Sequence, residues 1–242
     1  MTTSVPVVCL RHPGSRLRLP NGWEVERTLL DTIKTELAEA VICLTMFEQM
    51  FTMWTAPEPP TENDERWWEA VPSELRTSED VDKMMADIDR KAAEAARERL
   101  RSGDIPTDYA RRLGLVYARA FVASLRIVRG LLNVVSRDTG IDLSAATKPL
   151  DEALPHVTGV RDASAHRDDR AQGLVGPKRE PINAPVVLVE CLEGNVLVST
   201  TGKRGERGRV PIADATLMRV VEAVQVVIEC LPWEGRKREW YF

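Results

Sequence analysis

Four long stretches of this chain predict α-helices. In three of them apolar residues recur every three or four positions, the spacing that places them on one helix face, and the second stretch is dominated by Ala, Glu, Arg and Lys. Ser78 and Asp214 stand where the second and fourth stretches begin, and both are residue types that cap helix N-termini. A shorter helix over residues 143–154, with Ser144 as its candidate cap, and another that starts near Thr158 are expected before the fourth stretch. The four long helices are predicted over residues 23–54, 78–101, 108–135 and 214–231.

Three of these helices each present an apolar face that we expect to be buried. In the first helix the face consists of Leu30, Ile33, Leu37, Val41, Leu44 and Phe51. In the third helix, which we expect at the centre of the core, it consists of Leu113, Val116, Ala120, Ser124, Ile127 and Leu131. In the last helix, which ends before Pro232, it consists of Leu217, Val220, Val221, Val224, Val227, Ile228 and Leu231.

The pattern changes to β-branched runs before the last helix. Residues 186–192 and 196–201 predict two strands joined by Glu193-Gly194-Asn195, a hairpin turn, and residues 209–212 predict a third short strand. The fold class is therefore mainly α: a helical bundle with a small β-hairpin or three-strand insertion, 186–212, before the last helix. The proline-rich and acidic residues 56–74 are expected to form a connecting loop, pinned by two tryptophans, Trp67 and Trp68.

Composition narrows the class of protein. With 242 residues, of which 43% are hydrophobic and 29% charged, the chain can bury a core and fold as one elaborated domain. The formal net charge of −4 argues against sequence-independent nucleic-acid binding by the whole surface but leaves room for a local basic patch. The most apolar long segment, 113–135, contains Arg119, Arg126 and Arg129, so we expect a buried helix rather than a membrane span.

Cysteine usage and the first residues bear on the cellular compartment. The four cysteines are far apart, form no CxxC pair and lie mostly in apolar runs, so we expect reduced thiols in the core. The chain starts without a basic stretch followed by a long apolar one, so we expect no secretory signal. Both features favour a cytoplasmic protein. The cysteines are Cys9, Cys43, Cys191 and Cys230.

One short stretch, RDASAH at residues 161–166, gathers residue types that chemistry needs. Asp162 and His166 are four residues apart and would share a helix face, where the carboxylate can fix the tautomer of the imidazole. Arg161 precedes His166 by five residues and lies about 140° around an ideal helix. Arg161 and His166 therefore converge only by long reach, by a bend in the helix, or through a second copy of the chain.

These residues resemble the hallmark motif of the HEPN superfamily, helical domains in which Arg is followed by a polar residue and, four to six positions after the Arg, by His. Here the three are Arg161, Asp162 and His166. The placement is also similar, because the motif in such domains lies at the start of a late helix after two long helices. A tyrosine-containing, adenylylated subgroup is disfavoured, since Asp168 stands two positions beyond His166.

The resemblance also implies a division of the chain. Residues 23–231 would form a HEPN-like antiparallel helical bundle, with the β segment as an insertion outside the minimal bundle of the family. Residues 1–22 would be an N-terminal extension, and residues 232–242 a basic and aromatic C-terminal tail.

The resemblance implies metal-independent RNA cleavage without a cofactor, commonly in toxin–antitoxin, abortive-infection (phage-defence) or stress systems. Attack by a ribose 2′-OH on the neighbouring phosphate needs a base, an acid for the leaving 5′-oxygen and stabilisation of the phosphorane charge. His166 would serve as general acid or base, Arg161 as phosphate clamp and Asp162 as the orienting group. One imidazole cannot donate and accept at once, so two copies of His166 in a homodimer would divide these roles. The implied partners are an RNA substrate and an antitoxin or operon-encoded protein.

Two groups of basic residues are weaker candidates for RNA contacts. One group forms a row beside the apolar face of the third helix and could follow an RNA backbone. The other lies in the hairpin turn TGKRGERG and could contact phosphate. The row is more simply explained as a solvated flank paired with acidic neighbours, and the glycine-rich turn as merely exposed. The row consists of Arg112, Arg119, Arg126 and Arg137, and the turn holds Lys203, Arg204, Arg207 and Arg209.

Other chemistry has little support in the sequence. His12 and His156 lie near prolines in expected loops, and no Cys/His spacing fits a zinc site. The TGKRGERG turn lacks the spacing of a phosphate-binding P-loop. The C-terminal RKREWYF could stack bases or dock on a partner, although packing back on its own domain is the simpler expectation.

The competing interpretation of RDASAH is a helix end with surface ion pairs that contribute little stability. The chain would then be a non-catalytic helical dimerisation or interaction module, because a fold does not fix a function. Small-ligand sensing within the bundle is a third, weaker alternative. A ribonuclease requires Arg161 and His166 to be solvent-accessible in one cleft, within one chain or together with a symmetric copy.

Overall fold

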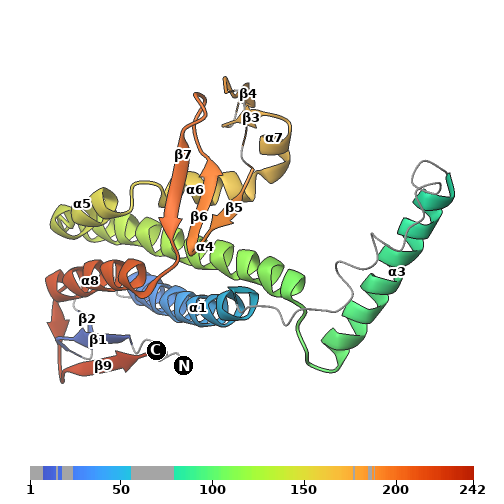
Figure 1. Cartoon of the computed structure of the whole chain (residues 1–242). Helices are drawn as coiled ribbons and strands as arrows, with labels where there is room; N and C mark the ends of the chain where they lie inside the picture. The colour runs from blue at the N-terminus through green and yellow to red at the C-terminus, as the bar shows by residue number, and fades with distance from the viewer. Residues whose placement is uncertain are drawn as a thin grey trace. The chain divides into compact units, whose positions relative to one another are not determined.

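The computed structural model describes residues 8–14, 16–17, 24–55, 79–176, 178–184, 187 and 189–242. Its contacts divide the chain into two compact units, Met1–Gln49 with Gly114–Phe242, and Met50–Leu113. The described part is mainly helical, with small sheets of two or three strands (Figure 1). The expected loop over 56–74, including Trp67 and Trp68, and the predicted cap Ser78 lie outside the described residues.

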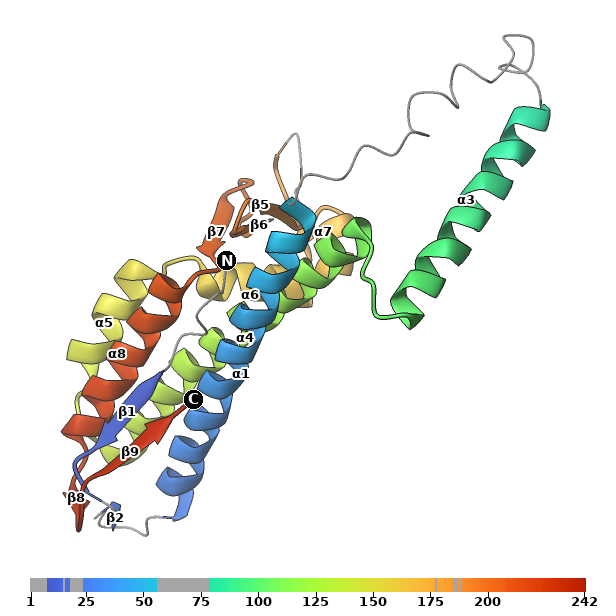
Figure 2. The same ribbon diagram turned by 60° about the horizontal axis from the view of Figure 1, so that its bottom comes forward.

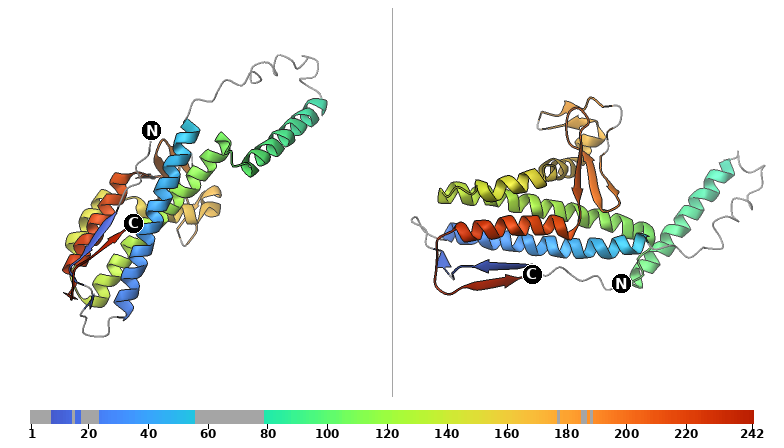
Figure 3. Two further views of the ribbon diagram at one scale, coloured as in Figure 1. Left: turned by 90° about the horizontal axis from the view of Figure 1, so that it is seen from below. Right: turned by 60° about the vertical axis from the view of Figure 1, so that its left-hand side comes forward.

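The long helices follow the predicted stretches closely. In the first unit, most of α1 and α4 runs alongside α5 and α8 in one bundle (Figures 2 and 3). In the second unit, α3 carries ion pairs one helical turn apart, such as Arg90 with Glu94 at 2.9 Å. None of the helices in the described ranges is long and apolar enough to cross a membrane. The helices are α1 (Glu24–Thr55), α3 (Glu79–Arg101), α4 (Thr107–Thr139), α5 (Ser144–Ala153), α6 (Val157–Ala165), α7 (Arg167–Ala171) and α8 (Asp214–Cys230).

The core faces predicted for the first and last long helices are confirmed, with one exception. All seven apolar residues predicted for the last helix are buried, and so are five of the six predicted for α1. Phe51 is only half-buried, whereas Phe47 is fully buried on α1. The opposite faces are mostly polar, although Ile42 and Met53 of α1 and Met218 and Val226 of α8 are exposed, so the 3.6-residue period still identifies the buried side.

The apolar face predicted for α4 is wrong by about one position, although Ser124 is buried as expected. The residues it buries include Ala118, Phe121, Leu125, Val128 and Leu132. Val116 and Ile127, which we expected in the core, are 50% and 38% exposed. Apolar residues surround most of the circumference of α4, so the spacing fits two faces equally well. The structure buries the face with the larger side chains and leaves the other one outward.

Two predicted helix caps are wrong as well. The N-cap of α5 is Leu143, and the backbone N–H of Ser144 donates to Asp142 Oδ1 at 2.9 Å. The N-cap of α8 is Ala213, which has no side-chain hydrogen bond. Asp214 is instead the first helical residue, where its negative charge interacts favourably with the positive end of the helix dipole.

The predicted β insertion is an antiparallel sheet of three strands in the order β5-β6-β7. The hairpin turn holds Gly194 at φ 61°, a left-handed conformation that glycine adopts without strain. Helix α6 packs against β6 and β7, and a Cβ atom at Gly208 would lie 2.4 Å from Thr201 Cγ2 and 2.7 Å from Val160 Cγ2. The strands are β5 (Cys191–Glu193), which begins later than predicted, β6 (Val196–Thr200) and β7 (Arg207–Pro211).

The two ends of the described chain pair with each other. Strand β1 (Cys9–His12) is antiparallel to β9 (Arg238–Tyr241), and β2 (Arg16–Leu17) is antiparallel to β8 (Trp233–Glu234). Gln225 of α8 holds this sheet, because its side chain accepts from the backbone N–H of Arg11 at 2.8 Å and donates to the carbonyl of Arg11 at 2.9 Å. His12, expected in a loop, therefore lies in a strand.

The cysteines differ from the expected core thiols. Cys9, Cys43 and Cys191 are half-buried and Cys230 is exposed, and none of the four forms a disulfide bond among the described residues. Cys230 is the last residue of α8, after the buried Val227 and Ile228. An apolar run therefore does not place every cysteine within it on the buried side.

Candidate functional site

The segment RDASAHRDDR forms two short helices instead of the single helix that we expected. Helix α6 ends at Ala165, and His166 follows with φ −116° and ψ 48°, outside the helical range. Backbone hydrogen bonds nevertheless continue on both sides of the break. The N–H of His166 donates to the carbonyl of Asp162 at 3.1 Å, and the N–H of Arg170 donates to the carbonyl of His166 at 3.1 Å. The break changes the direction of the chain at the histidine of the motif.

Arg170, at the far end of the segment, anchors it to the sheet. Its side chain is 5% exposed, Nε donates to the carbonyl of Thr200 at 3.0 Å, and an Nη nitrogen donates to the carbonyl of Leu174 at 2.7 Å. Thr200 lies in β6 and Leu174 in β3 (Leu174–Val175), which pairs with β4 (Glu180–Pro181). Burial lowers the pKa of Arg170, while the nearby Asp169 and Asp162 oppose that shift. Arg170 therefore has a structural task.

A buried carboxylate that the sequence analysis missed ties the motif to α4. The side chain of Glu190, just before β5, is 1% exposed and accepts hydrogen bonds from Ser164 Oγ on α6 and from Arg119 Nε on α4. Arg119, expected to contact RNA, is thus occupied by an acidic group 71 residues away in the chain. The available signal was a single carboxylate in the otherwise apolar run VVLVECL.

The remaining members of the motif face solvent. Arg161 and Asp162 form an ion pair at 3.2 Å, and their side chains are 43% and 48% exposed. His166 is exposed, and no side chain or backbone group of the described residues hydrogen-bonds to its imidazole. The expected contact between Asp162 and His166 is therefore not formed within the described structure, because Asp162 pairs with its neighbour Arg161. The carboxylate is placed to orient the guanidinium rather than the imidazole.

The other predicted RNA-binding residues are scattered. Arg112 lies in the second unit, and within the described part of the chain the buried Nε of Arg126 has no hydrogen-bonding partner. In the turn between β6 and β7, Lys203 pairs with Glu180 of β4, and the backbone N–H of Arg204 donates to Glu206. Lys203 and Arg204 are both exposed. The contacts of these residues do not join the two predicted groups into one surface.

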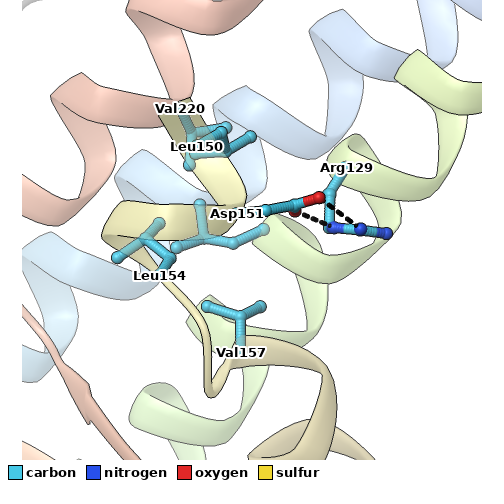
Figure 4. A pocket seen from close by; sticks show the side chains of 7 residues that line it. Arg129, Leu150, Asp151, Leu154, Val157 and Val220 are labelled. Carbon is cyan, nitrogen blue, oxygen red and sulfur yellow. Dashed lines mark hydrogen bonds and ion pairs between the residues drawn. The ribbon is translucent and has the colours of Figure 1, made fainter. Parts of the chain in front are cut away.

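One pocket of the first unit lies between α4, α5, α6 and α8 (Figure 4). Leucine and valine side chains line most of it, and the ion pair of Arg129 with Asp151, at 2.7 Å, forms one wall. The volume of the pocket is about 210 Å³ even when the part open to solvent is included, which is less than the volume of a typical ligand site. Its size does not fit a nucleotide, and neither Arg161 nor His166 contributes to it.

His12 is the histidine with the most unusual surroundings. The residue is 2% exposed, its ring centroid lies 3.6 Å from that of Trp240 and 4.9 Å from that of Trp233, and neither ring nitrogen has a hydrogen-bonding partner among the described residues. Burial, with a smaller effect of Lys34, lowers the pKa of His12 to about 4. The described residues hold no cluster of three or more His, Cys, Asp or Glu side chains suited to a metal ion. His12 is thus a packed ring of the terminal sheet.

Comparison of the chain with protein-family models, with curated proteins and with solved structures gives no match. The resemblance to the HEPN superfamily therefore rests on the sequence motif Arg161, Asp162 and His166 alone.

Proposed function

We propose that this chain is a HEPN-like, metal-independent endoribonuclease of the toxin or phage-defence type, whose Arg161 and His166 act in a homodimer. The observation that carries the proposal is the contrast within one segment. Ser164 and Arg170 are engaged in holding the segment in place, whereas His166 and Arg161 are accessible at its surface. An exposed imidazole without an internal partner can exchange protons with a bound substrate.

The proposed reaction uses two imidazoles. One copy of His166 takes the proton of a ribose 2′-OH as the 2′-oxygen forms a bond to phosphorus. A second copy, protonated, gives its proton to the 5′-oxygen as the bond between phosphorus and that oxygen breaks. Arg161 donates to the phosphate oxygens, whose charge grows in the transition state. The products carry a 2′,3′-cyclic phosphate and a 5′-hydroxyl, and no metal takes part.

The ion pair with Asp162 suits Arg161 to this task. Both side chains are nearly half exposed, so their attraction is screened by water and contributes little stability. An RNA phosphodiester, whose single negative charge is shared by two oxygens, can therefore replace the carboxylate at low cost. Until then Asp162 keeps the guanidinium extended at the surface.

The test is cleavage of labelled RNA by the purified protein in the presence of a metal chelator. Wild type is expected to produce fragments with 2′,3′-cyclic phosphate ends, and His166→Ala to be at least about 100-fold slower, the usual contribution of a general acid or base. His156→Ala is the matched control, because His156 is an exposed histidine at the N-cap of the same helix and makes no side-chain cap bond. Equal cleavage by wild type and His166→Ala, or no cleavage by wild type, contradicts the proposal.

A non-catalytic interaction module is the second candidate. The observation that favours it is that Asp162 contacts Arg161, which leaves the imidazole of His166 without the orienting group that many acid–base histidines have. A wild-type protein that leaves RNA intact and does not slow growth when expressed would favour this second function.

A further inference from the structure

The outward face of α4 carries an apolar pattern that reads the same in both directions. Val116, Ala120, Ala123 and Ile127 are separated by four, three and four residues. On an α-helix they fall within a sector of about 60°. Val116 and Ile127 are 50% and 38% exposed, and the two alanines between them are half-buried. This set of four residues is called the α4 face below.

We propose that the α4 face binds the α4 face of a second copy of this chain, antiparallel about a twofold axis. This inference deepens the proposed function, because it names the interface on which a composite site would depend. In such a pair Val116 meets Ile127 of the other copy, and Ala120 meets Ala123. The small alanines at the centre let the two helices approach closely, while the larger residues fill the space on either side.

The symmetry of the pattern selects a second copy as the occupant. A twofold interface must be self-complementary, with each residue meeting the residue at the mirrored position. A partner of different sequence requires no such symmetry in this chain. The α4 face also contains no polar side chain, so burying it against itself leaves no hydrogen-bonding group unsatisfied.

The position of this twofold axis relates the interface to the motif. The centre of the pattern lies between Phe121 and Val122, about 4 Å along the helix axis from Arg119. Arg119 is bonded to Glu190, and Glu190 is bonded to Ser164, two residues before His166. The end of α6 therefore lies on the Arg119 flank of α4, close to the level of the axis.

An antiparallel twofold pair of helices brings the same flank of both copies to one side. Two Arg119 flanks, and with them two ends of α6, would line a common groove. Arg126 is on this flank too, so the two copies of Arg126 would border the groove, and their charge suits a phosphate backbone. The α4 face thus supplies the second copy that Arg161 and His166 require.

The first experiment measures the mass of the full-length protein in solution by sedimentation or light scattering. Wild type is expected at twice the chain mass of 27.1 kDa. Ala123→Glu, which places a charge at the centre of the interface, is expected to weaken self-association at least about 100-fold. Asn133→Glu is the matched control, since Asn133 is exposed on the same helix outside the α4 face and the charge change is equal. Circular dichroism checks that both variants are folded.

The second experiment uses small substitutions that do not threaten the fold. Ala120→Cys and Ala123→Cys chains are mixed in equal amounts and oxidised, with wild type in parallel to account for the native thiols. The antiparallel pair predicts that the mixture forms more disulfide-linked dimer than either variant alone, because position 120 faces position 123.

These measurements separate the inference from the proposed function. A monomeric wild type, a dimer that Ala123→Glu leaves intact, or equal crosslinking by the mixture and the single variants would overturn the α4 interface, whether or not RNA is cleaved. A dimer that depends on Ala123 but cleaves no RNA supports the interface and contradicts the ribonuclease.

Discussion

Two histidines, in different regions of the first unit, show what burial does to the same side chain. His12 in β1 and His166 between α6 and α7 both lack a hydrogen-bonding partner in the described structure. His12 is enclosed by Trp233 and Trp240 and acts as an apolar ring, whereas His166 is exposed to water. The lack of a partner therefore marks a packing residue in one region and an available proton carrier in the other.

The same contrast appears between two arginines of the motif segment. Arg170 is buried and bonds two backbone carbonyls, and Arg167, three residues earlier, is exposed. A charged side chain removed from water must be fully engaged, so its loss leaves its partners unsatisfied. An exposed one exchanges its contacts with water at little cost.

The largest expected effect follows from this difference. Arg170→Ala should lower the free energy of unfolding by about 4 kcal/mol, because it removes a buried charge and leaves the carbonyls of Thr200 and Leu174 without a donor. Arg167→Ala should change it by less than about 0.5 kcal/mol. Urea denaturation followed by circular dichroism measures both. Similar losses in the two variants would show that Arg170 does not anchor the segment.

His12 should make stability depend on pH in a defined window. Its pKa of about 4 in the folded protein lies below the ordinary value of 6.5, so the folded state binds fewer protons than the unfolded state between these values. The stability that the neutral imidazole of His12 contributes is fully present above pH 6.5. It is lost as pH falls to about 4, and the loss reaches up to about 3 kcal/mol.

The variant His12→Phe sharpens this test. Phenylalanine keeps an aromatic ring between Trp233 and Trp240 but cannot be protonated. Denaturation of both proteins at a series of pH values should give a difference in unfolding free energy that grows below pH 6.5 and levels off near pH 4. A constant difference across this range would mean that His12 is charged or solvated in the folded protein.

A substitution at the contact between α6 and the sheet should have an intermediate effect on the free energy of unfolding. Gly208→Ala introduces a Cβ 2.4 Å from Thr201 Cγ2 and 2.7 Å from Val160 Cγ2, so neighbouring atoms must shift. We expect a loss of about 1–3 kcal/mol, typical of overpacking. Thr201→Ser removes the closer methyl group and should restore part of the loss in the double variant. A double variant no more stable than Gly208→Ala would locate the strain elsewhere.

The sequence predicted these regions unevenly, for physical reasons. Helix α8 has one continuous apolar face, and Met218 and Val226 are isolated apolar residues on its mostly polar side, so its core residues follow from the period. Helix α4 has two apolar faces, and the choice between them depends on which neighbours it meets. The contact of Glu190 with Arg119 and Ser164 joins distant parts of the chain, and no local pattern specifies it.

The site was predictable in its residue types but not in its geometry. Arg161, Asp162 and His166 stood out by charge and spacing, yet their arrangement depends on the end of α6 at Ala165. Neither glycine nor proline marks that end in RDASAHRDDR. The anchoring of Arg170 to β3 and β6, which holds α7 in a new direction, is a tertiary contact that the sequence analysis could not supply.

The smallest expected effect on stability belongs to His166. His166→Ala should keep the free energy of unfolding within about 0.5 kcal/mol of wild type, because the imidazole is exposed and bonded to nothing in the described structure. Truncation of a histidine that packs in the core or caps a helix would lower the free energy of unfolding more, as we expect for His12→Ala. Denaturation of the two alanine variants side by side tests this, and a loss above about 1 kcal/mol for His166→Ala would give the residue a structural role. With stability unchanged, any loss of RNA cleavage in the same variant comes from the missing imidazole and not from a damaged fold.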